Sequence, residues 1–234
     1  MHIPRIYQTV TLQGGHTISL DKQASHHLKN VLRLKLKDSL IVFNGLGGEY
    51  HATLIDYNKA YIKEYIPIKN ESPLLIHLGQ SLCRNDKMDY IIQKSVELGV
   101  NQLTPIYTKR TEVKITEKKP QRWQNIIINA CEQCGRNILP VMEKPKSMSQ
   151  YIDAEKSVLK LILTPGQGVS LQELEASPSS VSLLIGPESG FDPEEVQKAI
   201  ASGFQTIRLG PRILRTETAA LAMISALQLK WGDF

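Results

Sequence analysis

Val181-Ser-Leu-Leu-Ile185 runs directly into Gly186-Pro-Glu-Ser-Gly190, and Ile207-Arg-Leu209 runs into Gly210-Pro-Arg-Ile-Leu-Arg-Thr-Glu-Thr218. Each stretch is a short apolar segment of strand type that ends in a glycine–proline loop. In an open α/β sheet, ligands bind in the crevice outside the carboxyl ends of the strands. Two such loops therefore predict a single pocket at one edge of an α/β domain.

Helix signals follow both loops. Asp192 is a good N-cap, with proline at the first helical position and Glu195 three residues after the cap, so a helix is predicted from here to about Ala201. After the second loop, Thr216-Glu-Thr218 can cap a terminal helix over residues 219–230. That helix is apolar around most of its circumference, which predicts burial on several sides and contact with a partner subunit.

The loops lack the usual signatures of a phosphate cradle. Neither Gly-x-Gly-x-x-Gly nor Gly-x-x-x-x-Gly-Lys-Ser/Thr occurs in the chain, so a pyrophosphate site is not supported. Backbone groups with Leu, Ile and Pro side chains fit a mostly apolar slot with main-chain hydrogen bonds, as for an adenine ring. A third break, Thr164-Pro-Gly-Gln-Gly168, follows the apolar run 158–163 and is expected to add a wall to the pocket.

The composition is typical of a globular protein with one large or two modest domains. The chain has 234 residues, of which 41% are hydrophobic, and its net charge of +5 favours an anionic partner. Its three cysteines form no even disulfide framework and no apolar run is long enough for a membrane span, so a cytoplasmic location is expected. Cys131-x-x-Cys134 has no second pair, so no metal site is predicted. All six histidines precede Leu78, which disfavours histidine acid–base chemistry in the pocket.

Residues 1–70 are predicted to form a small, mostly β domain. A hairpin is expected across Gly14-Gly15 and a short helix after Asp21, followed by strands over 40–43, 50–55 and 60–68. The polar side of the helix is basic, and it either forms a solvated surface or contacts RNA phosphates. After a linker at 71–75, residues 76–234 are predicted to form the α/β domain. Its first helix is expected over Lys87–Leu98, between two strands, as in parallel sheets.

Leu-Leu-Ile-Gly-Pro-Glu-Ser-Gly-Phe (183–191) and Leu-Gly-Pro-Arg-Ile-Leu-Arg-Thr-Glu-Thr-Ala (209–219) closely resemble the paired signatures of the SPOUT methyltransferases that modify uracil N3 in small-subunit (16S) ribosomal RNA. The resemblance covers almost the whole chain. It implies a trefoil-knotted α/β domain with a parallel sheet, S-adenosylmethionine as cofactor, a homodimer and an N-terminal PUA-like RNA-binding β-barrel. One departure is Ser189, which stands where the family usually has glycine.

The resemblance also implies roles for individual residues. The cofactor would be bound by Leu163, Leu184, Ile185, Gly186, Pro187, Gly190, Leu209, Gly210, Leu214, Thr216, Thr218 and Ala219. RNA would be contacted by Arg5, His27, Lys29, Arg33, Arg84, Lys87, Lys94, Arg110 and Arg136. For catalysis we expect Arg215 to stabilise the developing uracil anion, with Glu217 or Glu188 as an orienting carboxylate or proton acceptor. The alternatives are that Glu217 only caps the helix and that Arg215 only neutralises the charge of Glu217.

The expected activity is S-adenosylmethionine-dependent methylation of N3 of a specific uridine in 16S ribosomal RNA, with free RNA or the small ribosomal subunit as the substrate. Two alternatives stay open: a non-catalytic RNA-binding protein of ribosome assembly, and a SPOUT methyltransferase specific for ribose 2′-O or guanine N1. The complete Arg-Ile-Leu-Arg-x-Glu-Thr-Ala motif at 212–219 favours an enzyme, and residues 1–70 favour uracil N3.

Overall fold

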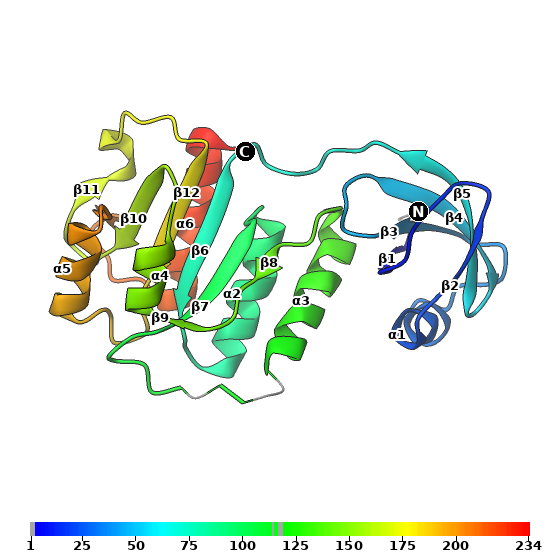
Figure 1. Ribbon diagram of the computed structural model, residues 1–234, viewed down its shortest axis with the longest axis horizontal. Helices are drawn as coiled ribbons and strands as arrows, with labels where there is room; N and C mark the ends of the chain where they lie inside the picture. Colours follow the sequence, from blue (N-terminus) through cyan, green and yellow to red (C-terminus); the bar gives the residue numbers. More distant parts are fainter. Residues whose placement is uncertain (1–2, 114, 117–118) are drawn as a thin grey trace. The chain divides into compact units, whose positions relative to one another are not determined.

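The computed structural model describes residues 3–113, 115–116 and 119–234 (Figure 1). The chain divides into two compact units. The first contains Met1–Glu71 and Ile128–Leu139, and the second contains Ser72–Ile127 and Pro140–Phe234. Helix α3 (Lys119–Cys134) therefore contributes its C-terminal part to the first unit. Within the described ranges, no helix combines the length and the apolar character that a bilayer span needs.

The first unit is built on a five-stranded sheet with the strand order β1-β3-β4-β5-β2. Strands β1 and β3 pair in parallel, and the pairs β3–β4, β4–β5 and β5–β2 are antiparallel. Side chains alternate along β5, where Ala60 and Ile62 are buried and their neighbours are exposed, as a half-buried strand requires. The elements are β1 (Arg5–Tyr7), β2 (Thr17–Ser19), α1 (Lys22–His26), a π-helical turn (His27–Val31), β3 (Ser39–Phe43), β4 (Glu49–Asp56) and β5 (Lys59–Ile66).

The predicted hairpin across Gly14-Gly15 is wrong. Strand β1 pairs with β3 and β2 pairs with β5, so the two segments on either side of the glycines are not partners. The glycine turn instead lies against β5, where Gly15 N donates to Ile62 O (2.9 Å). A Cβ atom at Gly14 would lie 3.0 Å from Lys63 O, so a larger residue here would crowd the backbone of β5.

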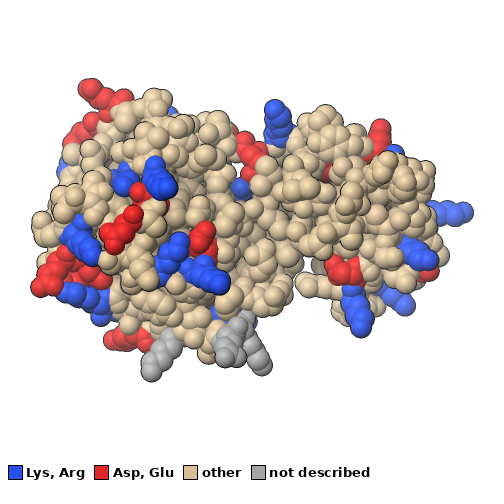
Figure 2. Space-filling view, viewed as in Figure 1, with Lys and Arg blue, Asp and Glu red and all other residues tan. Residues whose placement is uncertain are grey.

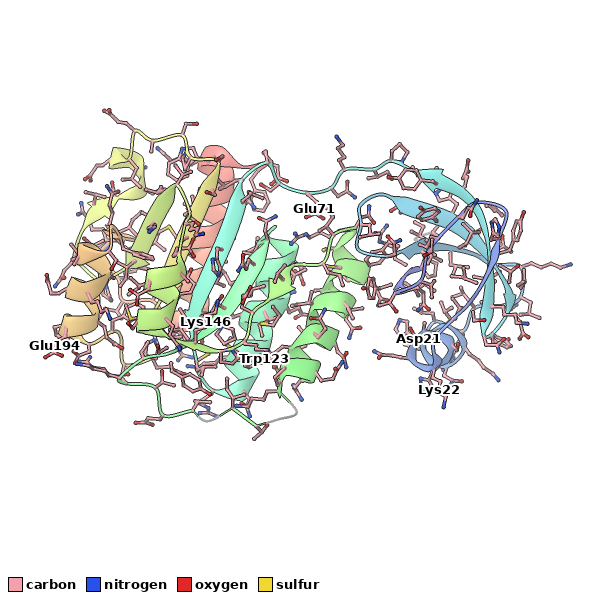
Figure 3. The ribbon with its side chains drawn as sticks, viewed as in Figure 1. Asp21, Lys22, Glu71, Trp123, Lys146 and Glu194 are labelled. Atoms are coloured by element: carbon pink, nitrogen blue, oxygen red, sulfur yellow. The ribbon has the colours of Figure 1, made fainter. Side chains whose placement is uncertain are left out.

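Buried polar contacts attach the segment Ile128–Leu139 to the first unit. Arg5 forms an ion pair with Glu49, and its Nη2 donates to Asn137 Oδ1 (2.6 Å). Tyr7 N donates to Glu132 Oε1 (2.9 Å). Glu71, which is labelled in Figure 3, accepts hydrogen bonds from Arg136 Nε (2.9 Å) and Nη2 (2.5 Å). These contacts explain why the end of α3 belongs to this unit.

The second unit is a parallel sheet with helices on both faces. Its strands run in the order β11-β13-β10-β12-β6-β7-β8, with β9 also paired to β7. Helices α4 and α5 cover one face, while α2 and α6 cover the other (Figure 1). The elements are β6 (Leu75–Ser81), α2 (Asn85–Glu97), β7 (Gln102–Tyr107), β8 (Val141–Met142), β9 (Lys146–Ser147), α4 (Met148–Ala154), β10 (Leu159–Leu163), β11 (Val169–Ser170), a 3-10 turn (Leu171–Glu173), β12 (Ser180–Ile185), α5 (Pro193–Ala201), β13 (Gln205–Arg208) and α6 (Thr216–Trp231).

The predicted α/β class and the first strand–helix–strand unit are confirmed by β6, α2 and β7. Strand β12 is buried on both faces because helices cover both, and residues 181–185 are all buried. On the α4 face, Leu184 packs in one core cluster with Tyr151 and Ile106. On the α6 face, Met223 and Ile224 are fully buried.

The start of α5 follows the prediction, and that of α6 does not. Asp192 caps α5 and Glu195 completes a capping box. The terminal helix begins at Thr216 with Arg215 as N-cap, and Arg215 makes no side-chain capping bond. Thr216 does not cap the helix because its hydroxyl donates to Gly186 O (2.7 Å). The start of α6 is therefore tied to the loop after β12.

Candidate functional site

A pocket of about 780 Å³ opens at the carboxyl ends of β10, β12 and β13. These strands are parallel neighbours around β10, so their following loops lie at one edge of the sheet. The loops after β10, β12 and β13 all contribute walls, as does α5. The apolar lining residues include Leu163, Ile185, Phe191, Leu209 and Leu214. The wall predicted at the third break is present, since Thr164, Pro165 and Gln167 line the pocket.

The loop after β12 is held in one conformation. Gly190 N donates to Pro187 O (2.9 Å), which closes a turn, and Gly190 has a φ of +70°. This positive φ is available to glycine at little cost. Ser189 does not adopt positive φ, so serine is accommodated here without strain. Its carbonyl accepts a hydrogen bond from Arg110 Nη1 (3.0 Å), which attaches the loop after β7 to the pocket wall.

Charged side chains gather at one side of the pocket. Lys87 Nζ lies 3.2 Å from Glu188 Oε1 and 3.7 Å from Glu217 Oε2. The hydrogen bond to Glu188 raises the pKa of Lys87. Burial raises the pKa of Glu188, but hydrogen bonds from its own backbone and from Lys87 outweigh it, so this pKa is lowered and the carboxylate stays ionised. Cys83 lies nearby, and burial, reinforced by the charge of Glu188, raises the pKa of its thiol to about 12.

The three predicted catalytic residues differ in access. Arg215 is exposed and lines the pocket, and within the described part of the chain its side chain forms no ion pair. Glu188 also lines the pocket, and its side chain is 40% exposed. The Glu217 side chain is 17% exposed, and its Oε2 is covered without a hydrogen-bond partner among the described residues. Direct contact with a ligand is therefore open to Arg215 and Glu188 and restricted for Glu217.

Most of the residues predicted to bind a cofactor line this pocket. They are Leu163, Ile185, Gly186, Pro187, Gly190, Leu209, Gly210, Leu214, Thr216 and Ala219. Leu184 does not, because alternation along β12 turns it into the core beneath α4. Thr218 does not either, since it lies exposed on α6. The prediction missed Phe191, which is part of the quoted motif, and Val196 and Gln197, which carry no local signal.

Comparisons with known proteins show which family this chain belongs to. Residues 70–228 match the model of an RNA methyltransferase domain, and residues 20–64 match that of an RNA methyltransferase PUA domain. The ribosomal RNA small subunit methyltransferase E of Buchnera aphidicola (subsp. Schizaphis graminum) is 43% identical over 99% of this chain and 98% of its own length. The chain belongs to the ribosomal RNA small subunit methyltransferase E family. The Bacillus subtilis member is 32% identical over 92% of this chain and 91% of its own.

Solved structures of similar proteins have the same fold. The Neisseria gonorrhoeae enzyme, bound to S-adenosylmethionine, matches with a TM-score of 0.94 and 38% identity over the full length of both chains. A methyltransferase of Legionella pneumophila in complex with S-adenosylmethionine matches with a TM-score of 0.96 and 40% identity, also over both full lengths. The expected α/β SPOUT methyltransferase fold with an N-terminal PUA-like domain is thereby confirmed.

The RNA-binding residues predicted for this methyltransferase E chain fall into two groups. Lys29 and Arg33 are exposed on the first unit and His27 is half-buried beside them, while Arg84, Lys87, Lys94 and Arg110 lie on the second unit. Arg5 and Arg136 differ, because both are buried in ion pairs with Glu49 and Glu71. Their guanidinium groups support the first unit and are not presented to a ligand. On the face in Figure 2, positive and negative side chains of the second unit are interspersed.

The cysteines of this family member give no sign of metal binding. Cys131 is buried in α3, where burial raises the pKa of its thiol to about 12, so it acts as a small buried group. Throughout the residues that the structure describes, no three His, Cys, Asp or Glu side chains are grouped so that they could hold a metal ion.

Proposed function

We propose that this protein methylates N3 of a specific uridine in 16S ribosomal RNA and that it uses S-adenosylmethionine as the methyl donor. The observation that carries this proposal is the pocket at β10, β12 and β13, which belongs to a fold that relatives at about 40% identity use to bind S-adenosylmethionine. The methyltransferase activity and the cofactor follow from the family. The choice of uracil N3 follows from the signature motifs and from the PUA-like domain that precedes them.

The residues of the pocket suit this cofactor. Its volume is in the range of cofactor sites. Apolar side chains such as Ile185 and Leu214 can enclose an adenine ring, while backbone groups of Gly186 and Gly210 can supply hydrogen bonds. Bound there, S-adenosylmethionine supplies a methyl group already activated by its positive sulfur. The chain therefore has to position the acceptor and remove one proton.

The proton is the main chemical demand on the protein. Uracil N3 carries a hydrogen on its Watson–Crick edge, so the base must be unpaired or flipped out. Glu188 is ionised, half-exposed and in the pocket wall, and we assign it as the acceptor of the N3 proton. As that N–H bond breaks, N3 forms its bond to the methyl carbon, and the carbon–sulfur bond breaks with its electron pair going to sulfur. Arg215 stabilises the negative charge that develops on the uracil.

The remaining expectations complete the proposal. Lys29 and Arg33, exposed on the PUA-like domain, contact RNA phosphates together with Arg84 and Arg110 of the methyltransferase domain. A homodimer forms through the outer side of α6, where Leu229 is 73% exposed. The chain of the α/β domain is threaded as the trefoil knot of the family. The protein works in the cytoplasm, where the small ribosomal subunit is found. Light scattering at micromolar concentration tests the dimer, and a fully active monomer would exclude it.

The proposed activity is tested by mass mapping of methylated nucleosides in 16S ribosomal RNA. Cells that lack the protein should lose a single 3-methyluridine, and the purified protein with S-adenosylmethionine should restore it on RNA or on isolated small subunits. Loss of a 2′-O-methyl or an N1-methylguanine instead would reassign the specificity. No change in any methylated nucleoside, with no uptake of S-adenosylmethionine in calorimetry, would leave a non-catalytic RNA-binding protein.

A further inference from the structure

Gln80 is a fully buried polar residue at the end of β6 that lies outside every motif described above. Its Nε2 donates to Thr216 Oγ1 (3.0 Å) and to Ser81 O (3.1 Å). A backbone carbonyl can only accept, so the bond to Ser81 determines which end of the amide is the donor. Thr216 must therefore accept the hydrogen bond from Gln80.

The direction of the next hydrogen bond follows from the first. Thr216 Oγ1 uses a lone pair for Gln80, and its own proton points to Gly186 O (2.7 Å), which can only accept. One directed chain thus joins β6, the first residue of α6 and the loop after β12. Gly186 and Thr216 both line the pocket, whereas Gln80 does not.

Gln80 carries a cost that a purely structural residue would avoid. Its Oε1 is buried and has no hydrogen-bond partner among the described residues. A buried acceptor without a partner destabilises the folded state, and an apolar side chain of similar size removes that cost. An apolar side chain could not donate a hydrogen bond to Thr216, however, and this bond is what Gln80 adds.

We propose that Gln80 is a positioning residue for the cofactor pocket. By directing the Thr216 hydroxyl onto Gly186 O, it holds the loops 186–190 and 209–216 in the arrangement that binds S-adenosylmethionine. This inference rests on the proposed function. Loops that are held before binding need no ordering when the ligand arrives, so the relay adds to cofactor affinity.

The test compares Gln80→Met with Gln228→Met. Gln228 is equally buried, but both ends of its amide are paired away from the pocket, with Leu98 O (2.8 Å) and Ser72 Oγ (2.6 Å). Calorimetry with S-adenosylmethionine should show the Kd of Gln80→Met raised about tenfold, the effect of about one buried hydrogen bond. KM for the cofactor should rise with it, while kcat at saturation changes less than about threefold. Gln228→Met should lower the thermal midpoint and leave the Kd unchanged.

Variants of Thr216 complete the test. Thr216→Val should weaken cofactor binding and Thr216→Ser should not, and Gln80→Met should add little to Thr216→Val because both interrupt one chain. If Gln80→Met does not fold, Gln80→Leu takes its place in the same comparison. Wild-type affinity in Gln80→Met, or losses that simply add, would overturn the relay while the proposed activity stands. A wild-type protein that binds no S-adenosylmethionine would overturn both.

Discussion

The buried pair of His77 and Glu155 allows a prediction about stability against pH. His77 Nδ1 lies 2.6 Å from Glu155, and the two side chains are only 15% and 5% exposed. Ser157 Oγ donates to the same carboxylate (2.6 Å), and the other ring nitrogen of His77 lies 2.8 Å from Thr104 Oγ1. The substitution Glu155→Gln removes the charge with little change in volume.

The magnitude follows from the carboxyl group. Burial raises the pKa of Glu155, but hydrogen bonds from His77 and Ser157 and the charge of His77 lower it from 4.5 to about 2. At about 1.4 kcal/mol per pH unit, this difference corresponds to about 3 kcal/mol of unfolding free energy at neutral pH. Because the folded-state pKa is the lower one, this stability is present above pH 4.5 and is lost as the pH falls toward 2.

Urea unfolding of the wild type and Glu155→Gln from pH 7 down to pH 3 measures the effect. The variant should lose about 3 kcal/mol at pH 7, and the gap should narrow below pH 4.5. Glu64→Gln is the matched control, because its partner His51 lies 3.5 Å away and the two side chains are 42% and 66% exposed. Solvent leaves such a pair worth at most about 1 kcal/mol. Equal losses in the two variants at pH 7, or a gap between wild type and Glu155→Gln that is as large at pH 3 as at pH 7, would refute the reasoning.

Three further outcomes are expected. Arg215→Ala should lower single-turnover methylation by about 10²-fold and change the Kd of S-adenosylmethionine less than about threefold, and equal losses would mean that it only holds the loop. Gly168→Ala places a Cβ 2.1 Å from Thr206 O at a φ of +87°, so urea unfolding should show a loss of about 1–3 kcal/mol. Gly166→Ala, with φ of +69° and open space, should cost less. Lys29→Ala should reduce the salt slope of RNA binding by about 1, and an unchanged slope would exclude a phosphate contact.

Local signals in the sequence were sufficient for most of the α/β unit and for the position of its pocket. The apolar run of β12, its glycine–proline loop and the cap at Asp192 are all contiguous, and each acts through neighbours in the chain. The motif at 212–219 likewise marked one wall of the pocket. Such features could be predicted because backbone propensity, capping and turn formation depend on a few adjacent residues.

Only the tertiary structure decided which polar residues are buried and what they pair with. Arg5 and Arg136 were predicted to contact RNA. Ion pairs with residues far along the chain instead make both of them buried structural groups. Gln80 gave no signal in its strand, because its role depends on Thr216, which lies 136 residues away in sequence. The free energy of a charged or polar side chain is set by its desolvation and by its hydrogen-bond partners, and both are determined by long-range packing.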